Sequence, residues 1–291
     1  MFRNLFRLSR PLNILFAALT YVLGLGLARY LGNPFHAVSF WLGLVGVLLT
    51  QTTMSLLAEV YRSNTDPIVP DETIAERKSL HDAMLYFSIA SLAALAVIAF
   101  LLYVNRLLSP SALLFLGLSL LLTILYSVPP ARLVNLGFGE LILAIHLAYV
   151  IPSIGFLLQA TDYHRLLGMI VFPLTSLAFA CFLVLDFPSF AQDQKYNRRT
   201  LLVRLGWERA VPLHNALIAI AYLTFLAAPA FGFSLTVLWP AFLTLPFAIL
   251  QIVGLRNIAL GGRPVWDFLT ATAIAVFGLT AYFLTLTFWL R

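Results

Sequence analysis

Two short stretches of this sequence place ionisable or polar side chains at the same spacing, at positions 0, 3 and 7. The first stretch holds Glu59, Arg62 and Asp66, and the second holds Asp186, Ser189 and Asp193. Residues three, four and seven positions apart lie on one face of a helix, so each triplet predicts a polar stripe at a helix end. Only 10% of the residues are charged, which makes a repeated charged pattern informative. Two such stripes that meet could hold one anionic ligand or a metal ion.

The composition predicts the elements that must carry these stripes. Of the 291 residues, 61% are hydrophobic and the mean hydropathy is +0.94, whereas a soluble domain has about 25% charged residues. An all-α membrane protein is therefore expected, a single domain over residues 1–291 with nine transmembrane helices. Helices that cross a hydrocarbon core of about 30 Å need about 20 apolar residues, and the candidate runs are 14–31, 38–58, 83–104, 111–127, 136–158, 167–186, 210–229, 235–253 and 268–290.

Lys and Arg residues are unevenly divided between the two ends of these runs. With the N-terminus in the cytoplasm, 14 of the 18 fall inside, and the other four are Arg29, Arg106, Arg165 and Arg291. The positive-inside rule therefore predicts a multi-pass protein of the inner membrane with both triplets on the cytoplasmic side. Its net charge of +6 suits anionic lipid headgroups, so membrane lipid is an expected partner and nucleic acid is not. The sequence does not indicate whether the protein binds other proteins.

A cleaved signal peptide, an internal disulfide and a zinc site are not expected. The first apolar run is too long for a signal peptide and has no evident cleavage site, so we interpret it as a retained span. The single cysteine, Cys181, lies inside a predicted span and has no partner for an internal disulfide. No spacing of His and Cys residues matches a zinc site.

Three further stretches carry recognisable motifs. They are Ser9-Arg10-Pro11-Leu12-Asn13, the turn from Tyr126 to Pro130 followed by Gly139-Glu140-Leu141, and the run from Arg199 to Gly206 that follows Asp193. In these motifs the chain resembles the UbiA superfamily of intramembrane prenyltransferases over nearly its whole length. The run from Arg199 is the most specific match, and Gly139-Glu140-Leu141 is similar to the branch that acts in menaquinone synthesis.

This resemblance implies a nine-helix bundle with a chamber that faces the cytoplasm. In the family, magnesium ions held by two Asp-rich motifs bind an isoprenyl diphosphate, and the allylic cation left by the diphosphate alkylates a small cyclic acceptor such as a quinone precursor. The resemblance implies Asp66, Asp186 and Asp193 as catalytic residues. It also implies that these three, with Glu59, hold the metal.

The chain lacks three of the metal-facing groups of the family pattern, and Glu59 stands in place of an aspartate. Ala58 replaces an asparagine, and Arg62 and Ser189 replace aspartates. Fewer carboxylates favour one magnesium ion, or none, over a pair of ions. A guanidinium can grip phosphate oxygens with two parallel hydrogen bonds, so we expect Arg62 to bind the diphosphate. Further candidates for that role are Lys195 and Arg198, and for Arg198 the alternative is an ordinary inner-loop cation.

Other functions and residue roles remain open from the sequence. The three replacements are also compatible with a catalytically impaired subunit that binds lipid or quinone, and a secondary transporter is a further alternative. Glu140 could make a structural hydrogen bond or contact a substrate. His146 is expected to sit deeper in the membrane, hydrogen-bonded to a neighbouring helix.

Overall fold

The structure is a computed structural model that describes residues 2–63, 65–70 and 72–291. Within these residues there is no strand, and nine helical segments are long and apolar enough to cross a membrane, as the sequence predicts. Five are single helices, namely α2 (Pro11–Tyr30), α3 (Ala37–Val60), α4 (Ile74–Val104), α5 (Pro110–Ser127) and α11 (Trp207–Leu226). Four are interrupted, namely α6 (Gly139–Ile145) with α7 (Ile151–Leu157), α8 (Arg165–Leu185) with α9 (Phe190–Lys195), α12 (Leu235–Leu238) with α13 (Leu245–Ala259), and α14 (Trp266–Ile274) with α15 (Thr280–Leu290).

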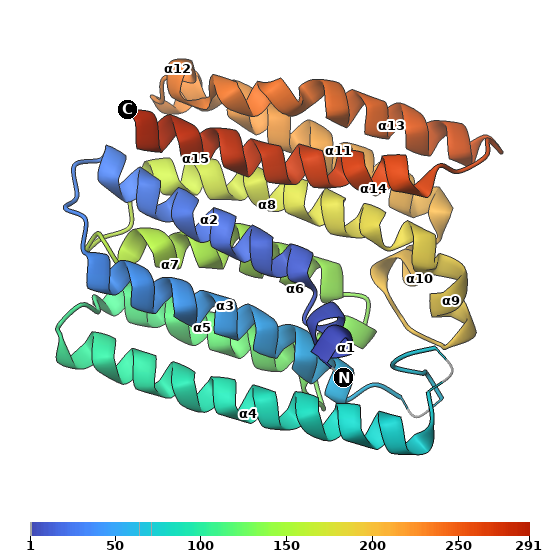
Figure 1. Cartoon of the computed structure of the whole chain (residues 1–291). Helices are drawn as coiled ribbons and strands as arrows, with labels where there is room; N and C mark the ends of the chain where they lie inside the picture. Colours follow the sequence, from blue (N-terminus) through green and yellow to red (C-terminus); the bar gives the residue numbers. More distant parts are fainter. Residues whose placement is uncertain (1, 64, 71) are drawn as a thin grey trace.

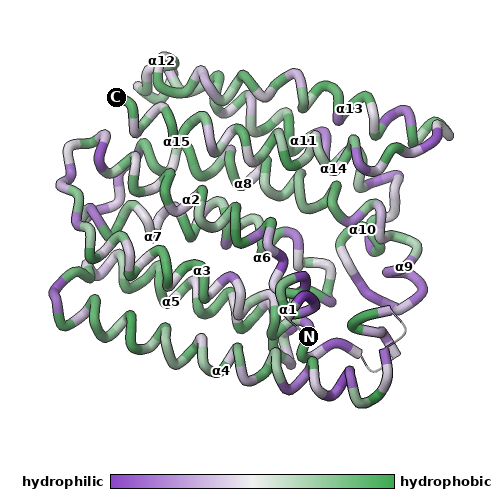
Figure 2. The backbone as a smooth tube through the Cα atoms, in the orientation of Figure 1, coloured by the Kyte–Doolittle hydropathy of each residue, from purple (hydrophilic) through white to green (hydrophobic). Residues whose placement is uncertain are grey.

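The nine segments run side by side and alternate in direction (Figure 1). The segment formed by α6 and α7 is the most enclosed, with 78% of its apolar window buried, whereas α4 lies at the edge of the bundle and is 17% buried. Two short helices, α1 (Phe2–Leu8) and α10 (Leu201–Leu205), lie at the end of the bundle that also holds α9. The hydrophilic residues 61–63, 65–70 and 72–73 and the stretch 186–206, which contains α9 and α10, lie at this end too (Figure 2), which we call the charged end.

The centre of the bundle depends on a close contact between α2 and α7. A Cβ atom on Gly24 would overlap the carbonyl oxygen of Pro152, and a Cβ on Gly155 would overlap the carbonyl oxygen of Tyr21. Glycine is therefore required at both positions for the two backbones to approach so closely. This contact fixes α2 against α7, and α2 leads back to Arg10 at the charged end.

Two helices extend further at the charged end than the apolar runs indicate. Helix α4 begins at Ile74 rather than near residue 83, because Thr73 caps it: the backbone N–H of Glu76 donates to Thr73 Oγ1 at 3.2 Å, and the backbone N–H of Thr73 donates to Glu76 Oε2 at 2.9 Å. The sixth segment continues past Asp186 through a 3₁₀ turn that contains Pro188 and through α9 to Lys195. Both extensions add polar residues beside the loops of the charged end.

Candidate active site

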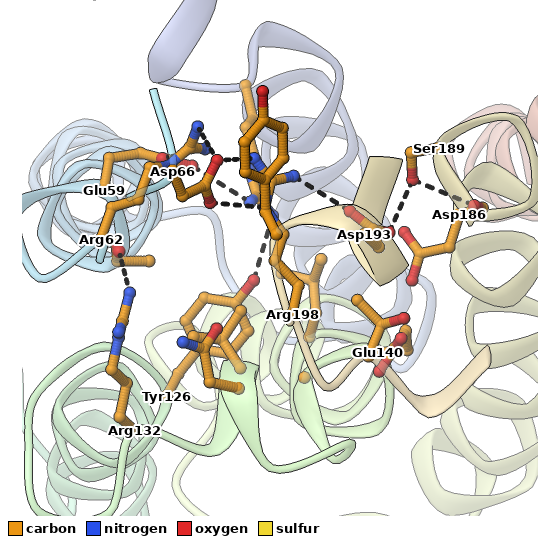
Figure 3. A pocket seen from close by; sticks show the side chains of 18 of the residues that line it. Glu59, Arg62, Asp66, Tyr126, Arg132, Glu140, Asp186, Ser189, Asp193 and Arg198 are labelled. Atoms are coloured by element: carbon orange, nitrogen blue, oxygen red, sulfur yellow. Dashed lines mark hydrogen bonds and ion pairs between the residues drawn. The ribbon is translucent and has the colours of Figure 1, made fainter. Parts of the chain in front are cut away.

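A cavity of about 580 Å³ is present at the charged end of the bundle. Its walls come from α2, α3, α5, α6, α8, α9 and the segments that follow α3, α5 and α9. All six residues of the two sequence triplets line it, so the structure brings together the two stripes that the spacing predicts (Figure 3). Five carboxylates and four guanidiniums line this cavity, namely Glu59, Asp66, Glu140, Asp186, Asp193, Arg10, Arg62, Arg132 and Arg198.

The first triplet is positioned by the end of α3. Glu59 lies in the last turn of the helix and is 5% exposed, and Asp66 lies in the following loop. Arg62 forms an ion pair with Glu59, and its Nη1 lies 3.8 Å from Asp66 Oδ1. The Nη1 group also donates to the carbonyl of Pro67 at 2.8 Å, which holds the guanidinium over the loop. Arg62 therefore partly neutralises the carboxylates of its own triplet.

The second triplet is positioned by the turn between α8 and α9. Ser189 Oγ lies 3.0 Å from the carbonyl oxygen of Asp186 and 2.8 Å from Asp193 Oδ2, so its hydroxyl can donate to either. Asp193 is buried, whereas Asp186 is partly exposed to the cavity. Ser189 thus orients its neighbours and adds no charge of its own.

Arg198 connects the two triplets. Its Nε and Nη2 donate to Asp66 at 2.7 and 2.8 Å, and its Nη1 donates to Asp193 at 3.0 Å. Asn197 adopts a left-handed conformation with φ +58°, which asparagine tolerates better than most residues, and this turn directs Arg198 back toward the acids. Burial lowers the pKa of Arg198, but the hydrogen bonds and charge of Asp66 raise it by more, so the guanidinium keeps its charge.

Two more arginines complete the cationic set. Arg10, which precedes α2, donates to the Tyr126 hydroxyl at 3.0 Å and lies 3.4 Å from Glu59 Oε1. Arg132 donates to the carbonyl of Ala58 at 3.2 Å, and burial lowers its pKa. Sequence reasoning did not assign Arg10, Tyr126 or Arg132 to the site. Two of its motifs, the Arg10-Pro11 motif and the turn that begins at Tyr126, already marked these segments.

Glu140 also lies in this cavity, near the start of α6, and is 6% exposed. Its Oε1 accepts the backbone N–H of Leu201 at 2.8 Å and so binds the first turn of α10. Its carboxyl group faces that of Asp186 (Figure 3), and the two are close enough to share a hydrogen bond when one carries a proton. Glu140 therefore makes the structural hydrogen bond considered from the sequence and also reaches the cavity.

The structure does not bring every candidate into the cavity. Lys195 lies in α9, is exposed and is not part of the cavity wall. Its ammonium is 5.3 Å from the ring centroid of the adjacent Tyr196. We therefore leave Lys195 out of the proposed diphosphate site. His146 lies deep in the bundle, as expected, where its ring is 3.1 Å from Gln51 Oε1 and 2.8 Å from Ser119 Oγ.

These residues fit one divalent cation better than two. Among the described residues, no three His, Cys, Asp or Glu side chains are assembled as a metal site. Glu59, Asp66 and Asp193 each interact with an arginine, which competes with metal coordination. Magnesium often uses only one or two carboxylates together with phosphate oxygens and water, and the side of the cavity near Asp186 offers such a set.

Comparison with known proteins identifies the family. The sequence pattern of the UbiA prenyltransferase family matches residues 17–260, whereas no curated protein gives a significant match. A UbiA homologue from Archaeoglobus fulgidus bound to GPP and Mg²⁺ superposes with a TM-score of 0.70 at 17% identity, covering 99% of this chain and 100% of that one. A structure from work on digeranylgeranylglyceryl phosphate synthase has a TM-score of 0.71 at 13% identity, covering 100% and 99%. A UbiA homologue from Aeropyrum pernix K1 has a TM-score of 0.53 at 18% identity over 92% and 96%. The chain therefore belongs to the UbiA prenyltransferase family.

Proposed function

We propose that this protein is a membrane prenyltransferase that moves an isoprenyl chain from a prenyl diphosphate to a small cyclic acceptor of the quinone-precursor type. The observation that carries the proposal is the cavity at the charged end, where four arginines and five carboxylates meet inside a bundle of apolar helices. Such a site suits a ligand with a highly charged head and a hydrocarbon tail. Family membership and the A. fulgidus homologue bound to GPP and Mg²⁺ support the same substrate class. The charged end would face the cytoplasm.

Arg62 and Arg198 are the residues proposed to hold the diphosphate, with help from Arg10. Each guanidinium can exchange a carboxylate for phosphate oxygens, because both partners accept the same pair of parallel hydrogen bonds. Arg62 and Arg198 contact Glu59, Asp66 and Asp193, so a bound diphosphate would compete directly with these acids. Preorganised positive charge at this point would stabilise the leaving group as the bond to carbon breaks.

The carboxylates keep the roles that the resemblance implies. Glu59, Asp66 and Asp193 would orient the arginines that they contact. Together with Asp186 they would hold one magnesium ion, directly or through water, near Asp186 and Asp193. When bound, the ion would neutralise negative charge on the departing diphosphate. Asp193 is also fixed by Ser189 and Arg198, so its carboxylate is already oriented toward the cavity.

An aromatic cluster lies against the cavity and would surround the reacting carbon. Phe182 lines the cavity, and its ring centroid is 6.3 Å from that of Phe16, which is 4.7 Å from Phe277. All three rings are buried. Aromatic rings stabilise a nearby cation without acting as nucleophiles, so this cluster would protect the allylic cation from water until the acceptor reacts.

The test is turnover by the purified protein in lipid nanodiscs with Mg²⁺, geranyl or farnesyl diphosphate and a set of aromatic quinone precursors as acceptors. Turnover is measured as pyrophosphate released together with prenylated acceptor. We expect turnover by the wild type and a loss of at least about 100-fold in Asp193→Asn, since removing a charge-stabilising group typically costs about 10²- to 10³-fold. Glu208→Gln, which alters an exposed acid at the same end, is the matched control and should keep full activity. Absence of both turnover and Mg²⁺-dependent binding for every prenyl diphosphate would contradict the proposal.

A second candidate function follows from the arginine pairing. Because Arg62 and Arg198 already neutralise acids that would bind metal, the protein could bind prenyl lipid or quinone without reacting it. Tight binding of a prenyl diphosphate with no release of pyrophosphate, in the wild type and at any Mg²⁺ concentration, would favour this non-catalytic subunit. Release that Asp193→Asn abolishes would exclude it.

A further inference from the structure

One carboxylate oxygen in the cavity has no hydrogen-bond donor. Glu140 Oε2 is fully buried from solvent and accepts no hydrogen bond in the described part of the chain. The other oxygen, Oε1, is fixed by the backbone N–H of Leu201 at 2.8 Å. A buried acceptor left without a donor is costly, so the unsatisfied oxygen indicates a missing partner on the cavity side.

The neighbouring carboxyl group cannot serve as a permanent hydrogen-bond partner for Glu140. Asp186 presents its own carboxyl group to Glu140 (Figure 3), and two ionised carboxylates at this separation repel each other. Neither Glu140 nor Asp186 forms an ion pair with an arginine within residues 2–63, 65–70 and 72–291, whereas the other three acids of the cavity do. The cavity thus has an acid pair on one side and the guanidiniums of Arg62 and Arg198 on the other.

We infer that Glu140 and Asp186 together form the binding site for a single Mg²⁺ ion, with Glu140 as a ligand outside both sequence triplets. Two carboxylates leave several positions of an octahedral ion for water and phosphate oxygens, which is how magnesium is commonly held. The inference rests on the proposed function only for the diphosphate that would complete the coordination. A bound diphosphate would then lie between the cation and the two guanidiniums. The cation would neutralise the phosphate oxygens on one side, and Arg62 and Arg198 would neutralise those on the other.

The position of Glu140 makes it suitable for this role. The hydrogen bond from Leu201 restricts the carboxylate to one orientation, since it ties α6 to the first turn of α10. Less conformational entropy is then lost when the second oxygen binds a cation. The rival explanation is that Glu140 and Asp186 simply share one proton, in which case Glu140 serves only to hold α10.

The experiment measures Mn²⁺ binding to the purified protein by the loss of the EPR signal of free Mn²⁺. Titrations are made with Mn²⁺ alone and with Mg²⁺ as competitor. Glu140→Gln is the informative variant, because its amide oxygen can still accept from Leu201 and its amide nitrogen can donate to Asp186. We expect the affinity for Mn²⁺ to fall on the order of 10- to 100-fold in Glu140→Gln and in Asp186→Asn. The thermal midpoint of Glu140→Gln should stay near that of the wild type, and Glu208→Gln should bind Mn²⁺ as the wild type does.

Two results would overturn the inference. One is Mn²⁺ binding by Glu140→Gln with wild-type affinity, and the other is no Mg²⁺-competed Mn²⁺ binding by the wild type. Failure of the proposed function is distinguishable, because it is measured separately as pyrophosphate release. A wild type that binds Mn²⁺ through Glu140 but never cleaves a prenyl diphosphate keeps the cation site and loses the transferase.

Discussion

Replacing Arg198 tests whether the two acidic stripes are joined through one side chain. In the structure this guanidinium makes three hydrogen bonds of 2.7 to 3.0 Å to Asp66 and Asp193, which are each 3% exposed. Arg198→Gln removes the positive charge that Asp193 pairs with and leaves Asp66 with only the longer contact to Arg62, at 3.8 Å. We therefore expect a clear loss of stability, and a smaller further loss when Asp66→Asn is added.

The size of the effect follows from burial. Removing one partner of a buried ion pair costs about 3–5 kcal/mol. The Arg198 side chain is 24% exposed and its partners border a cavity, so we take the lower limit of about 3 kcal/mol. At about 2 °C per kcal/mol for a chain of this length, Arg198→Gln should lower the thermal midpoint by about 6 °C. The coupling energy between Arg198 and Asp66 should be about 2 kcal/mol.

The assay is thermal unfolding in one detergent, followed by tryptophan fluorescence, for the wild type, both single variants and the double variant. Arg199→Gln is the matched control, because Arg199 is adjacent in sequence but exposed, and its midpoint should not move by more than about 1 °C. Additive effects of Arg198→Gln and Asp66→Asn would refute the reasoning, since groups that do not interact show no coupling.

Three other changes test separate parts of the structure. Gly24→Ala should destabilise the protein by about 1–3 kcal/mol because its methyl group would collide with α7, whereas Gly117→Ala, which meets nothing within 4 Å, should be neutral by the same thermal assay. Thr73→Ala should cost about 1 kcal/mol through loss of the helix cap of α4, and an unchanged midpoint would mean that the cap carries no stability. Phe182→Ala should enlarge the cavity and raise kcat/KM for farnesyl relative to geranyl diphosphate in competition assays; an unchanged ratio would show that the tail does not lie there.

The membrane fold is largely predictable because it follows from apolar run length. Few other structures could bury nine apolar runs whose backbone groups must satisfy one another within lipid. Apolar length alone misplaces the start of α4, since the helix is extended at the charged end by the Thr73 cap and not by hydropathy. The close contact of Gly24 with α7 is equally hidden, because a glycine in an apolar run does not reveal which helix it faces.

For the site, spacing predicts which residues share a helix face but not their partners. Both triplets do line one cavity. The pairing of Arg198 with Asp66 joins positions 132 apart and depends on the left-handed turn at Asn197, so no local pattern reveals it. Lys195 is only two residues from Asp193 and yet lies off the cavity wall. The sequence places Glu140 in a motif, but only the structure shows that one of its carboxylate oxygens has no hydrogen-bond donor.

The length of α4 bears on how an amphiphilic molecule would approach the protein. Its 31 residues span about 46 Å, which exceeds a hydrocarbon layer of about 30 Å by roughly ten residues. Every charged or histidine side chain of this helix lies between residues 74 and 83, and the remaining 21 residues are uncharged. The first three turns would therefore extend beyond the hydrocarbon layer. There Arg77 Nη2 donates a hydrogen bond of 2.7 Å to the carbonyl oxygen of Ser63, a residue of the cavity wall. A lipid beside these turns of α4 could place its polar head against the protein while its hydrocarbon chain stayed within the bilayer.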